Sequence, residues 1–232
     1  PLWTFKNNVP EGFNIVELLA AEEDYVSFGT FENFTNNSDW AVVEKVKMPE
    51  GTGEDGGWHF FRGYAWADKT GDIAISMSNS HILAWCQSGG WKSVEVNMTF
   101  QEEEWYTICF QYDATNTTLE LFVDGVSVGQ LTGVEPMDDS ANTNQLFWGG
   151  QEVSESRNVG DLYSEASIII AHQAWYQRLL TAGEISQYDG AVEDDPALFF
   201  SSEIGQISVI DASGNGRNGT NGNSPEFLGE SL

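Results

Sequence analysis

The chain has 232 residues, of which 36 are acidic and 9 are basic, so its formal net charge is −27. Nucleic acids and anionic membrane surfaces bind clustered Lys and Arg, and the chain has no such cluster, so we expect neither as a partner. The lack of an apolar run of about 18 residues predicts no membrane span. With 41% hydrophobic and 13% aromatic residues, the composition is typical of a folded domain and not of a disordered acidic tail.

Short runs rich in β-branched and aromatic residues recur along the chain, separated by Gly, Asn and Asp, which predicts a many-stranded antiparallel fold. The sequence LELFVDGVSVGQL carries the strongest local signal, because Asp124-Gly125 tolerates the positive φ angles of a tight hairpin turn. The expected strands are residues 25–28, 40–46, 58–66, 73–77, 81–86, 92–100, 105–112, 119–123, 127–131, 145–148 and 164–175.

A short helix is expected near residues 181–189. Thr181 and Glu184 stand three residues apart, the spacing at which each side chain can bind the other residue's backbone N–H in a capping box. Ile185 and Tyr188 supply an apolar side to this helix.

The last forty residues differ in composition from the rest of the chain. Residues 197–210 resemble one or two further strands, whereas residues 212–223 are rich in Gly and Asn and predict a loop. We therefore divide the chain into a β-sandwich over residues 1–190 and a C-terminal part over residues 191–232, which packs on the sandwich or on a partner.

Three stretches, taken in order, resemble parts of one superfamily. EEDYVSFGTFENFTNNSDWAVVEKVKM is similar to an opening D-Y-V strand and a strand with a W-V-K-like ending. EEEWYTICFQYDATNTTLELFVDGVSVGQL resembles a Trp-led strand that enters a V-D-G hairpin, and SEASIIIAHQAWYQRLLTAGEI resembles a closing strand followed by an L-x-x-x-E-I helix. Together they resemble the laminin G-like and pentraxin-like domains of the concanavalin A-like superfamily. The resemblance implies an all-β, two-sheet antiparallel jelly-roll sandwich.

The same resemblance implies a calcium site. Pentraxin-like members hold calcium through a mid-chain loop and a later Gln-Glu run, which match Asp68 and Asp72 in one place and Gln151 and Glu152 in the other. Calcium takes six to eight oxygen ligands, and these residues supply only part of that shell. Ordinary solvated carboxylates in turns are the alternative interpretation.

Two cysteines, Cys86 and Cys109, are too few for a disulfide-built scaffold. The residues alone leave open whether they pair or stay as buried thiols. The resemblance implies a disulfide to the strand that contains AVVEKV, but Val42 and Val43 stand where the second cysteine is needed. We therefore expect no disulfide of the family type.

Catalysis is not expected. Retaining glucanases of this fold place two carboxylates on one face of a strand, in an E-x-D-x-E pattern or a close variant. The chain has no such pattern, because Glu102-Glu103-Glu104 lacks the alternation and the three histidines have no recognisable Ser or Cys partner.

Aromatic residues give the better indication of function, since sugar rings stack on Trp and Tyr faces. Most of the nine Trp residues are expected in the core of a sandwich of this size. Trp58, Trp66 and Trp91 adjoin Gly-rich or polar loops, so we predict that they are exposed and bind the ligand.

The surroundings of the protein are inferred from charge and sequons. Five Asn-x-Ser/Thr sequons and a pI near 4.1 suit an extracellular, cell-surface or virion-surface location. Acidic pairs such as Asp138-Asp139 are interpreted as solvated surface. Because no charged-then-apolar leader precedes Pro1, we expect that any signal peptide was removed or that the chain is a processed piece.

Two functional hypotheses stay open. The first is a non-catalytic module that binds a carbohydrate or a surface polymer, with or without calcium. The second is a structural coat, decoration or appendage subunit of a viral particle or cell-surface assembly, whose partners are other protein subunits.

Overall fold

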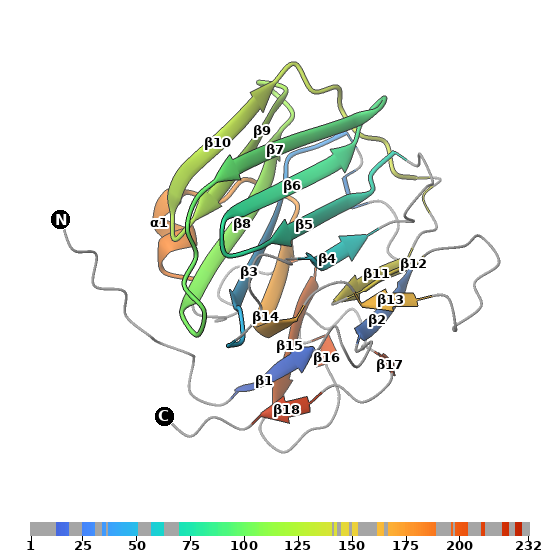
Figure 1. Ribbon diagram of the computed structural model, residues 1–232. Coiled ribbons are helices and arrows are strands. Elements are labelled where there is room, and N and C mark those ends of the chain that lie inside the picture. Colours follow the sequence, from blue (N-terminus) through green and yellow to red (C-terminus); the bar gives the residue numbers. More distant parts are fainter. Residues whose placement is uncertain are drawn as a thin grey trace.

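The computed structural model describes residues 13–18, 25–30, 34–35, 37–50, 57–62, 70–140, 142, 145–148, 150–152, 162–164, 167–188, 196, 198–203, 210–211, 220–222 and 226–228. Within these residues the protein consists of two large antiparallel sheets, a small third sheet and one short helix (Figure 1). The predicted all-β sandwich with a single short helix is confirmed.

The first sheet has nine strands, paired in the order β10-β9-β8-β3-β14-β1-β15-β16, with β18 added beside β1. Every pairing in this sheet is antiparallel. Its strands are β1 (Phe13–Leu18), β3 (Trp40–Lys47), β8 (Trp105–Asp113), β9 (Thr118–Val123), β10 (Val126–Thr132), β14 (Ile168–Tyr176), β15 (Leu198–Glu203), β16 (Ile210–Asp211) and β18 (Glu226–Leu228).

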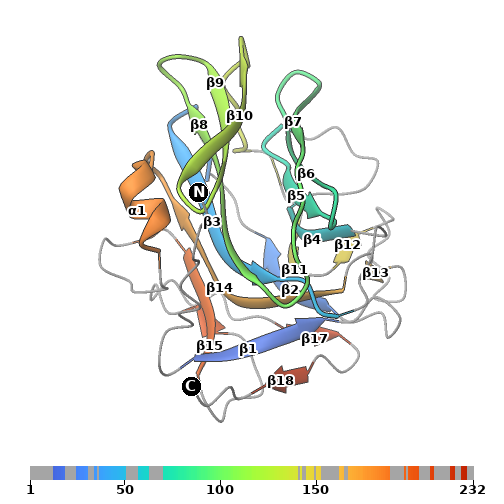
Figure 2. The ribbon, with the colours of Figure 1, turned by 60° about the vertical axis from the view of Figure 1, so that its left-hand side comes forward.

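The second sheet has seven strands in the order β17-β2-β11-β4-β5-β6-β7 and faces the first across the core (Figure 2). Its strands are β2 (Tyr25–Thr30), β4 (Gly57–Arg62), β5 (Ile73–Met77), β6 (His81–Gln87), β7 (Trp91–Asn97), β11 (Gln145–Trp148) and β17 (Thr220–Gly222). Strands β12 (Gly150–Glu152) and β13 (Leu162–Ser164) form the separate pair.

Alternate residues of the facing strands fill the core between the sheets. Trp40, Trp148 and Trp175 are among the largest fully buried side chains of this core, whereas the buried Trp85 belongs to a separate small cluster. One buried amide links several core side chains: Gln173 Oε1 accepts hydrogen bonds from Trp148 Nε1 at 3.1 Å and Trp175 Nε1 at 2.9 Å. Gln173 Nε2 donates to the buried Glu44 Oε2 at 3.0 Å. This network joins strands of both sheets.

The edges of the two sheets meet where β10 passes β7. A Cβ placed on Gly129 of β10 would lie 2.7 Å from Val94 Cγ1 and 2.9 Å from Val96 Cγ2. Glycine is therefore needed here so that the two edge strands can close the sandwich, and a bulge between Ser127 and Gly129 accompanies the approach.

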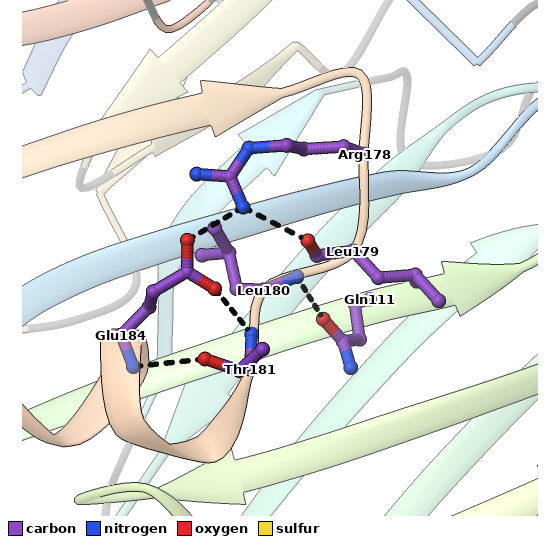
Figure 3. Close-up of polar contacts among 6 residues, drawn as sticks. All are labelled: Gln111, Arg178, Leu179, Leu180, Thr181 and Glu184. Carbon is purple, nitrogen blue, oxygen red and sulfur yellow. Dashed lines mark hydrogen bonds and ion pairs between the residues drawn. The ribbon is translucent and has the colours of Figure 1, made fainter. Parts of the chain in front are cut away.

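Helix α1 (Ala182–Ser186) lies on the outer side of the nine-stranded sheet (Figure 2). Its predicted capping box is confirmed, since Thr181 Oγ1 accepts from Glu184 N and Glu184 Oε2 accepts from Thr181 N (Figure 3). Ile185 packs on Leu180 and Tyr176 in a second apolar cluster, which also contains Ala41, Val43, Cys109, Phe122 and Ala174. This cluster covers one end of the sheet.

The predicted hairpin between β9 and β10 is also confirmed. Asp124 and Gly125 have φ angles of 49° and 78°, as a two-residue turn with left-handed central residues requires. The Asp124 side chain has a further structural role, because its Oδ1 accepts a hydrogen bond from Thr107 N at 2.8 Å.

Two features differ from the prediction made from the sequence. Strand β1 was not predicted, although it pairs with β14, β15 and β18. The prediction of a loop across residues 212–223 is wrong at Thr220–Gly222, which pair with β2. Backbone hydrogen bonds to β2, and not the Gly- and Asn-rich side chain pattern, define this strand. The division at residue 190 stays a prediction.

Cys86 and Cys109 are free, buried thiols, so the expectation of no family-type disulfide is confirmed. Val43 lies directly opposite Cys109 in the pairing of β3 with β8. Burial raises the pKa of Cys86 to about 12 and raises that of Cys109 further still. Both thiols are therefore neutral packing groups at physiological pH.

Candidate functional site

The outer face of the β6–β7 hairpin carries a paired aromatic surface. Trp91 is the first residue of β7 and is 54% exposed, whereas Trp85 of β6 is 2% exposed. Their ring centroids are 4.0 Å apart with an interplanar angle of 37°. Trp85 packs in turn on Ala74 and Leu83. Trp91 is thus supported from below by a buried ring and keeps about half of its surface open to solvent.

A tight turn fixes the start of β7. Gly89 and Gly90 have φ angles of 59° and 135°, which only glycine adopts without strain at the second position. Ser88 N donates to Gly90 O at 3.0 Å, and Ser88 Oγ donates to Glu135 O. Trp91 follows directly after this anchored turn, so its backbone has little freedom.

Polar side chains continue the aromatic surface along β7. The sequence WKSVEVN alternates, so that Val94 and Val96 pack on the core while Ser93, Glu95 and Asn97 are exposed on the other face. Because the rise is about 3.4 Å per residue, the row from Trp91 to Asn97 is about 20 Å long. We name Trp85, Trp91, Ser93, Glu95 and Asn97 the hairpin face.

His81 lies at the far end of the hairpin face, opposite Asn97 in the pairing of β6 with β7. Its Nδ1 is 2.8 Å from Ser78 Oγ, and Ser78 Oγ also accepts from the His81 backbone N at 3.3 Å. These contacts orient the imidazole ring at the edge of the row. The described surface therefore offers an aromatic plane at one end and hydrogen-bonding groups along its length.

The turn before Trp91 is hydrogen-bonded to a neighbouring segment that contains Asp72. We call the two buried carboxylates there, Asp72 and Asp139, the acidic rim. Gln87 N donates to Asp72 O at 2.9 Å, and Gly71 N donates to Gln87 O at 3.0 Å. Asp72 is fully buried, and its Oδ1 accepts from Asn142 Nδ2 at 2.7 Å. The rim is thus continuous with β6 and positions the turn that carries Trp91.

Asp139 belongs to the same rim and corrects one expectation. It is fully buried, and its Oδ2 accepts a hydrogen bond from Phe34 N at 2.8 Å, so its interpretation as solvated surface is wrong. A Cβ on Gly71 would lie 2.3 Å from Asp139 Cβ. The close backbone approach at Gly71 places this carboxylate inside, where backbone N–H groups replace water as its partners.

The predicted ligand-binding Trp residues have different outcomes. Trp91 is exposed, as predicted. The backbone of Trp58 lies in β4 opposite Ser76 of β5, but its side chain lies outside the described residues. Trp66 also lies outside them. The binding role of all three stays a prediction.

The predicted calcium ligands are only partly described. Asp72 has Asn142 as a described partner, and Asp68 lies outside the described residues. Gln151 and Glu152 have backbone positions in β12, but their side chains are not described. Among the residues that the structure does describe, no group of three or more His, Cys, Asp or Glu is arranged to hold a metal ion. Calcium binding therefore stays a prediction.

Sequence reasoning missed most of the hairpin face. The stacking of Trp85 on Trp91 was not predicted, and Ser93, Glu95 and Asn97 were not singled out. The alternation of WKSVEVN is the signal that finds them, because it places every second side chain on the face shared with Trp91.

The sequence was compared with known families. The family model described as the concanavalin A-like lectin/glucanases superfamily matches residues 20–186, which is most of the chain. The chain belongs to this superfamily. No curated protein sequence matches it significantly.

Solved structures show the same fold for this concanavalin A-like chain. A heptameric SAP-like pentraxin from Limulus polyphemus is 12% identical, with a TM-score of 0.59 over 92% of this chain and 95% of that chain. A Bacteroides ovatus protein provisionally described as carbohydrate binding is 13% identical, with a TM-score of 0.67 over 94% of this chain and 60% of that chain. The binding domain of Paraclostridial Mosquitocidal Protein 1 is 15% identical, with a TM-score of 0.54 over 79% and 46% of the two chains. At these identities the likeness establishes the fold alone.

Among the described residues, no helix is long and apolar enough to cross a membrane.

Proposed function

We propose that the protein is a non-catalytic carbohydrate-binding module that holds a glycan on the hairpin face, with Trp91 as the stacking platform. The observation that carries the proposal is the 54% exposure of a Trp ring supported by a second, buried Trp. A sandwich that buries so many of its other described aromatic side chains leaves this ring open. An exposed, pre-positioned aromatic ring is a common centre of a binding site.

The hairpin face has the two kinds of group that a sugar requires. The apolar C–H side of a pyranose ring packs on an aromatic plane, which Trp91 supplies. The hydroxyl groups at the ring edge need hydrogen-bond donors and acceptors, which Ser93, Glu95 and Asn97 supply at alternate positions of the same strand. Because Trp85 and the anchored turn hold Trp91 in place, little side-chain freedom is lost on binding.

The name of the Bacteroides ovatus structure adds support, because carbohydrate binding has been assigned provisionally to a protein of this fold. The location that fits this proposal is extracellular or on a cell or virion surface. The alternative role as a coat or decoration subunit receives less support. Strands β17 and β18 pair with β2 and β1 of the same chain, so their order requires no other subunit.

Calcium assistance is a finer part of the proposal. Asp68, Asp72, Gln151 and Glu152 are its candidate ligands, and the described contact of Asp72 with Asn142 shows how an amide can order one of these carboxylates. Calcium would be held by their oxygen atoms together with backbone carbonyls. It would order the rim next to the turn that carries Trp91.

A glycan array tests the proposal directly. We expect the wild-type protein to bind a defined subset of glycans, and Trp91→Ala to lose at least about tenfold in affinity for them, since truncation of a central aromatic anchor removes about 2 kcal/mol or more. Trp91→Phe keeps an aromatic plane and should stay within about fivefold of wild type. The array is run with calcium and with a chelator, and loss of binding in the chelator alone supports the calcium site.

Val126→Ala is the matched control, because Val126 is 55% exposed at the β9–β10 turn, which lies against helix α1, and is not part of the hairpin face. It should bind like wild type. Far- and near-ultraviolet circular dichroism confirms that each variant is folded. Absence of any bound glycan in either condition, or equal binding by wild type and Trp91→Ala, contradicts the proposal.

A further inference from the structure

We infer that the glycan on the hairpin face is neutral and that acidic glycans are rejected there, with Glu95 as the residue that rejects them. This inference rests on the proposed function and specifies the chemical class of its ligand. It is carried by the placement of charged side chains on and around β7.

Glu95 is the charged residue of the hairpin face. It is exposed in the middle of the row, opposite Leu83 in the pairing of β6 with β7, with uncharged Ser93 and Asn97 on either side. A neutral sugar hydroxyl can donate a charge-assisted hydrogen bond to this carboxylate. A sulfate or carboxylate on the sugar would instead meet a like charge at contact distance, where repulsion in water weakens binding by about fivefold.

The nearest described cation on β7 does not offset Glu95. Lys92 follows Trp91 directly, but alternation turns it to the opposite side of the strand. It lies opposite Cys86, whose side chain is in the core, and its charge acts on the Cys86 thiol. Lys92 is therefore not placed to neutralise an acidic group lying on Trp91 and Glu95.

The other cationic side chains that the structure describes belong to the nine-stranded sheet or its outer loop and are engaged there. Lys45 donates to Thr107 Oγ1 at 3.2 Å. Lys47 forms an ion pair of 3.2 Å with Glu103, and Arg178 forms one of 2.7 Å with Glu184. None of these described residues is on the hairpin face.

The charge of the whole chain acts in the same direction. At −27, the protein repels an approaching polyanion over distances of about 10 Å at moderate ionic strength. This long-range term is screened by salt, whereas the contact between Glu95 and a bound acidic group is screened less. The two contributions can therefore be separated by experiment.

The first experiment compares a neutral glycan with its sulfated derivative. The strongest neutral glycan found on an array is chemically sulfated, and both forms are titrated by calorimetry at about 20 mM and about 500 mM salt. We expect the sulfated form to bind at least about tenfold more weakly at low salt, with the ratio narrowing at high salt. An acidic glycan as the strongest ligand of the wild-type protein, lost in Trp91→Ala, overturns the inference while the proposed function stands. No bound glycan at all overturns the proposed function and the inference with it.

The second experiment separates Glu95 from the net charge. Glu95→Lys and Glu50→Lys both change the charge of the chain by the same amount, and Glu50 is exposed beyond the end of β3 and is not part of the hairpin face. We expect Glu95→Lys to bind the sulfated form at least about fivefold more tightly than Glu50→Lys does. Equal affinities of the two variants for the sulfated form overturn the role given to Glu95.

Discussion

The two outer faces of the sandwich are built differently. On the nine-stranded sheet, every residue of β3 and β14 is buried, and Leu180 and Ile185 from the loop and helix α1 complete a second apolar cluster. On the seven-stranded sheet, β7 alternates between buried and open positions and presents Trp91 to solvent. One face therefore contributes to stability, and the other is available for binding.

The sequences of the strands already contain this difference. Strand β14 reads IIIAHQAWY, a nearly continuous apolar run that is typical of a strand covered on both faces. Strand β7 reads WKSVEVN, an alternating pattern that is typical of a strand with one open face. The exception in β7 is Trp91, an aromatic residue at an open position, which is why it indicates a function.

The largest effect on stability is expected from a substitution that leaves a cavity on the covered face. Ile185 is fully buried against Leu180 and Tyr176, so Ile185→Ala leaves a cavity beneath helix α1 and should lower the free energy of unfolding by about 2–4 kcal/mol. Urea unfolding followed by fluorescence measures the change. Val126→Ala, at a position that is 55% exposed, should change it by less than about 0.5 kcal/mol. Equal effects of the two variants would remove the distinction between the faces.

A smaller effect on stability is expected from the open face. Trp91→Ala removes a half-exposed ring that stacks on Trp85, which should lower the free energy of unfolding by about 1 kcal/mol. The same variant is expected to lose glycan binding by at least about tenfold, so its effects on stability and on affinity separate. A stability loss as large as that of Ile185→Ala would instead assign Trp91 to the structural core.

Most of the fold follows from local sequence patterns. The β9–β10 hairpin was predicted because Asp124-Gly125 encodes the turn within two residues, and helix α1 because Thr181 and Glu184 encode its cap. Strand β1 was missed because its pairing with β14 joins residues about 150 positions apart, which no local pattern reveals. The short strand β17 was missed because it lies in a Gly- and Asn-rich stretch and is defined by its backbone pairing with β2.

The candidate site was predictable only in part. Trp91 could be found because Ser88-Gly89-Gly90 marks a turn beside it. Its stacking on Trp85 depends on the register of β6 with β7, and the burial of Asp139 depends on the close approach of Gly71 from a distant loop. Both are tertiary contacts, so the sequence alone could not distinguish a buried acidic residue from a solvated one.

The smallest expected effect is a pH dependence of stability on the covered face, which comes from Glu184 in helix α1. Glu184 Oε2 accepts from Thr181 N at 2.7 Å and Oε1 pairs with Arg178 Nη1 at 2.7 Å (Figure 3). Chiefly through the Thr181 backbone bond, these contacts lower the pKa of Glu184 in the folded protein. The unfolded chain therefore binds more protons between the two pKa values, so this stabilisation is present above the unfolded value and is lost as pH falls through the folded one.

Because the Arg178 and Glu184 side chains are both more than a third exposed, the charge of Glu184 should contribute only a few tenths of a kcal/mol to stability. Urea unfolding of wild type and Glu184→Gln between about pH 3 and about pH 7 measures it, with Glu50→Gln as an exposed control. The wild type should be the more stable protein near neutral pH, and the difference should disappear toward the acidic end. A difference that persists unchanged at low pH would mean that Glu184 stabilises the helix by packing or by its neutral hydrogen bonds, and not by its charge.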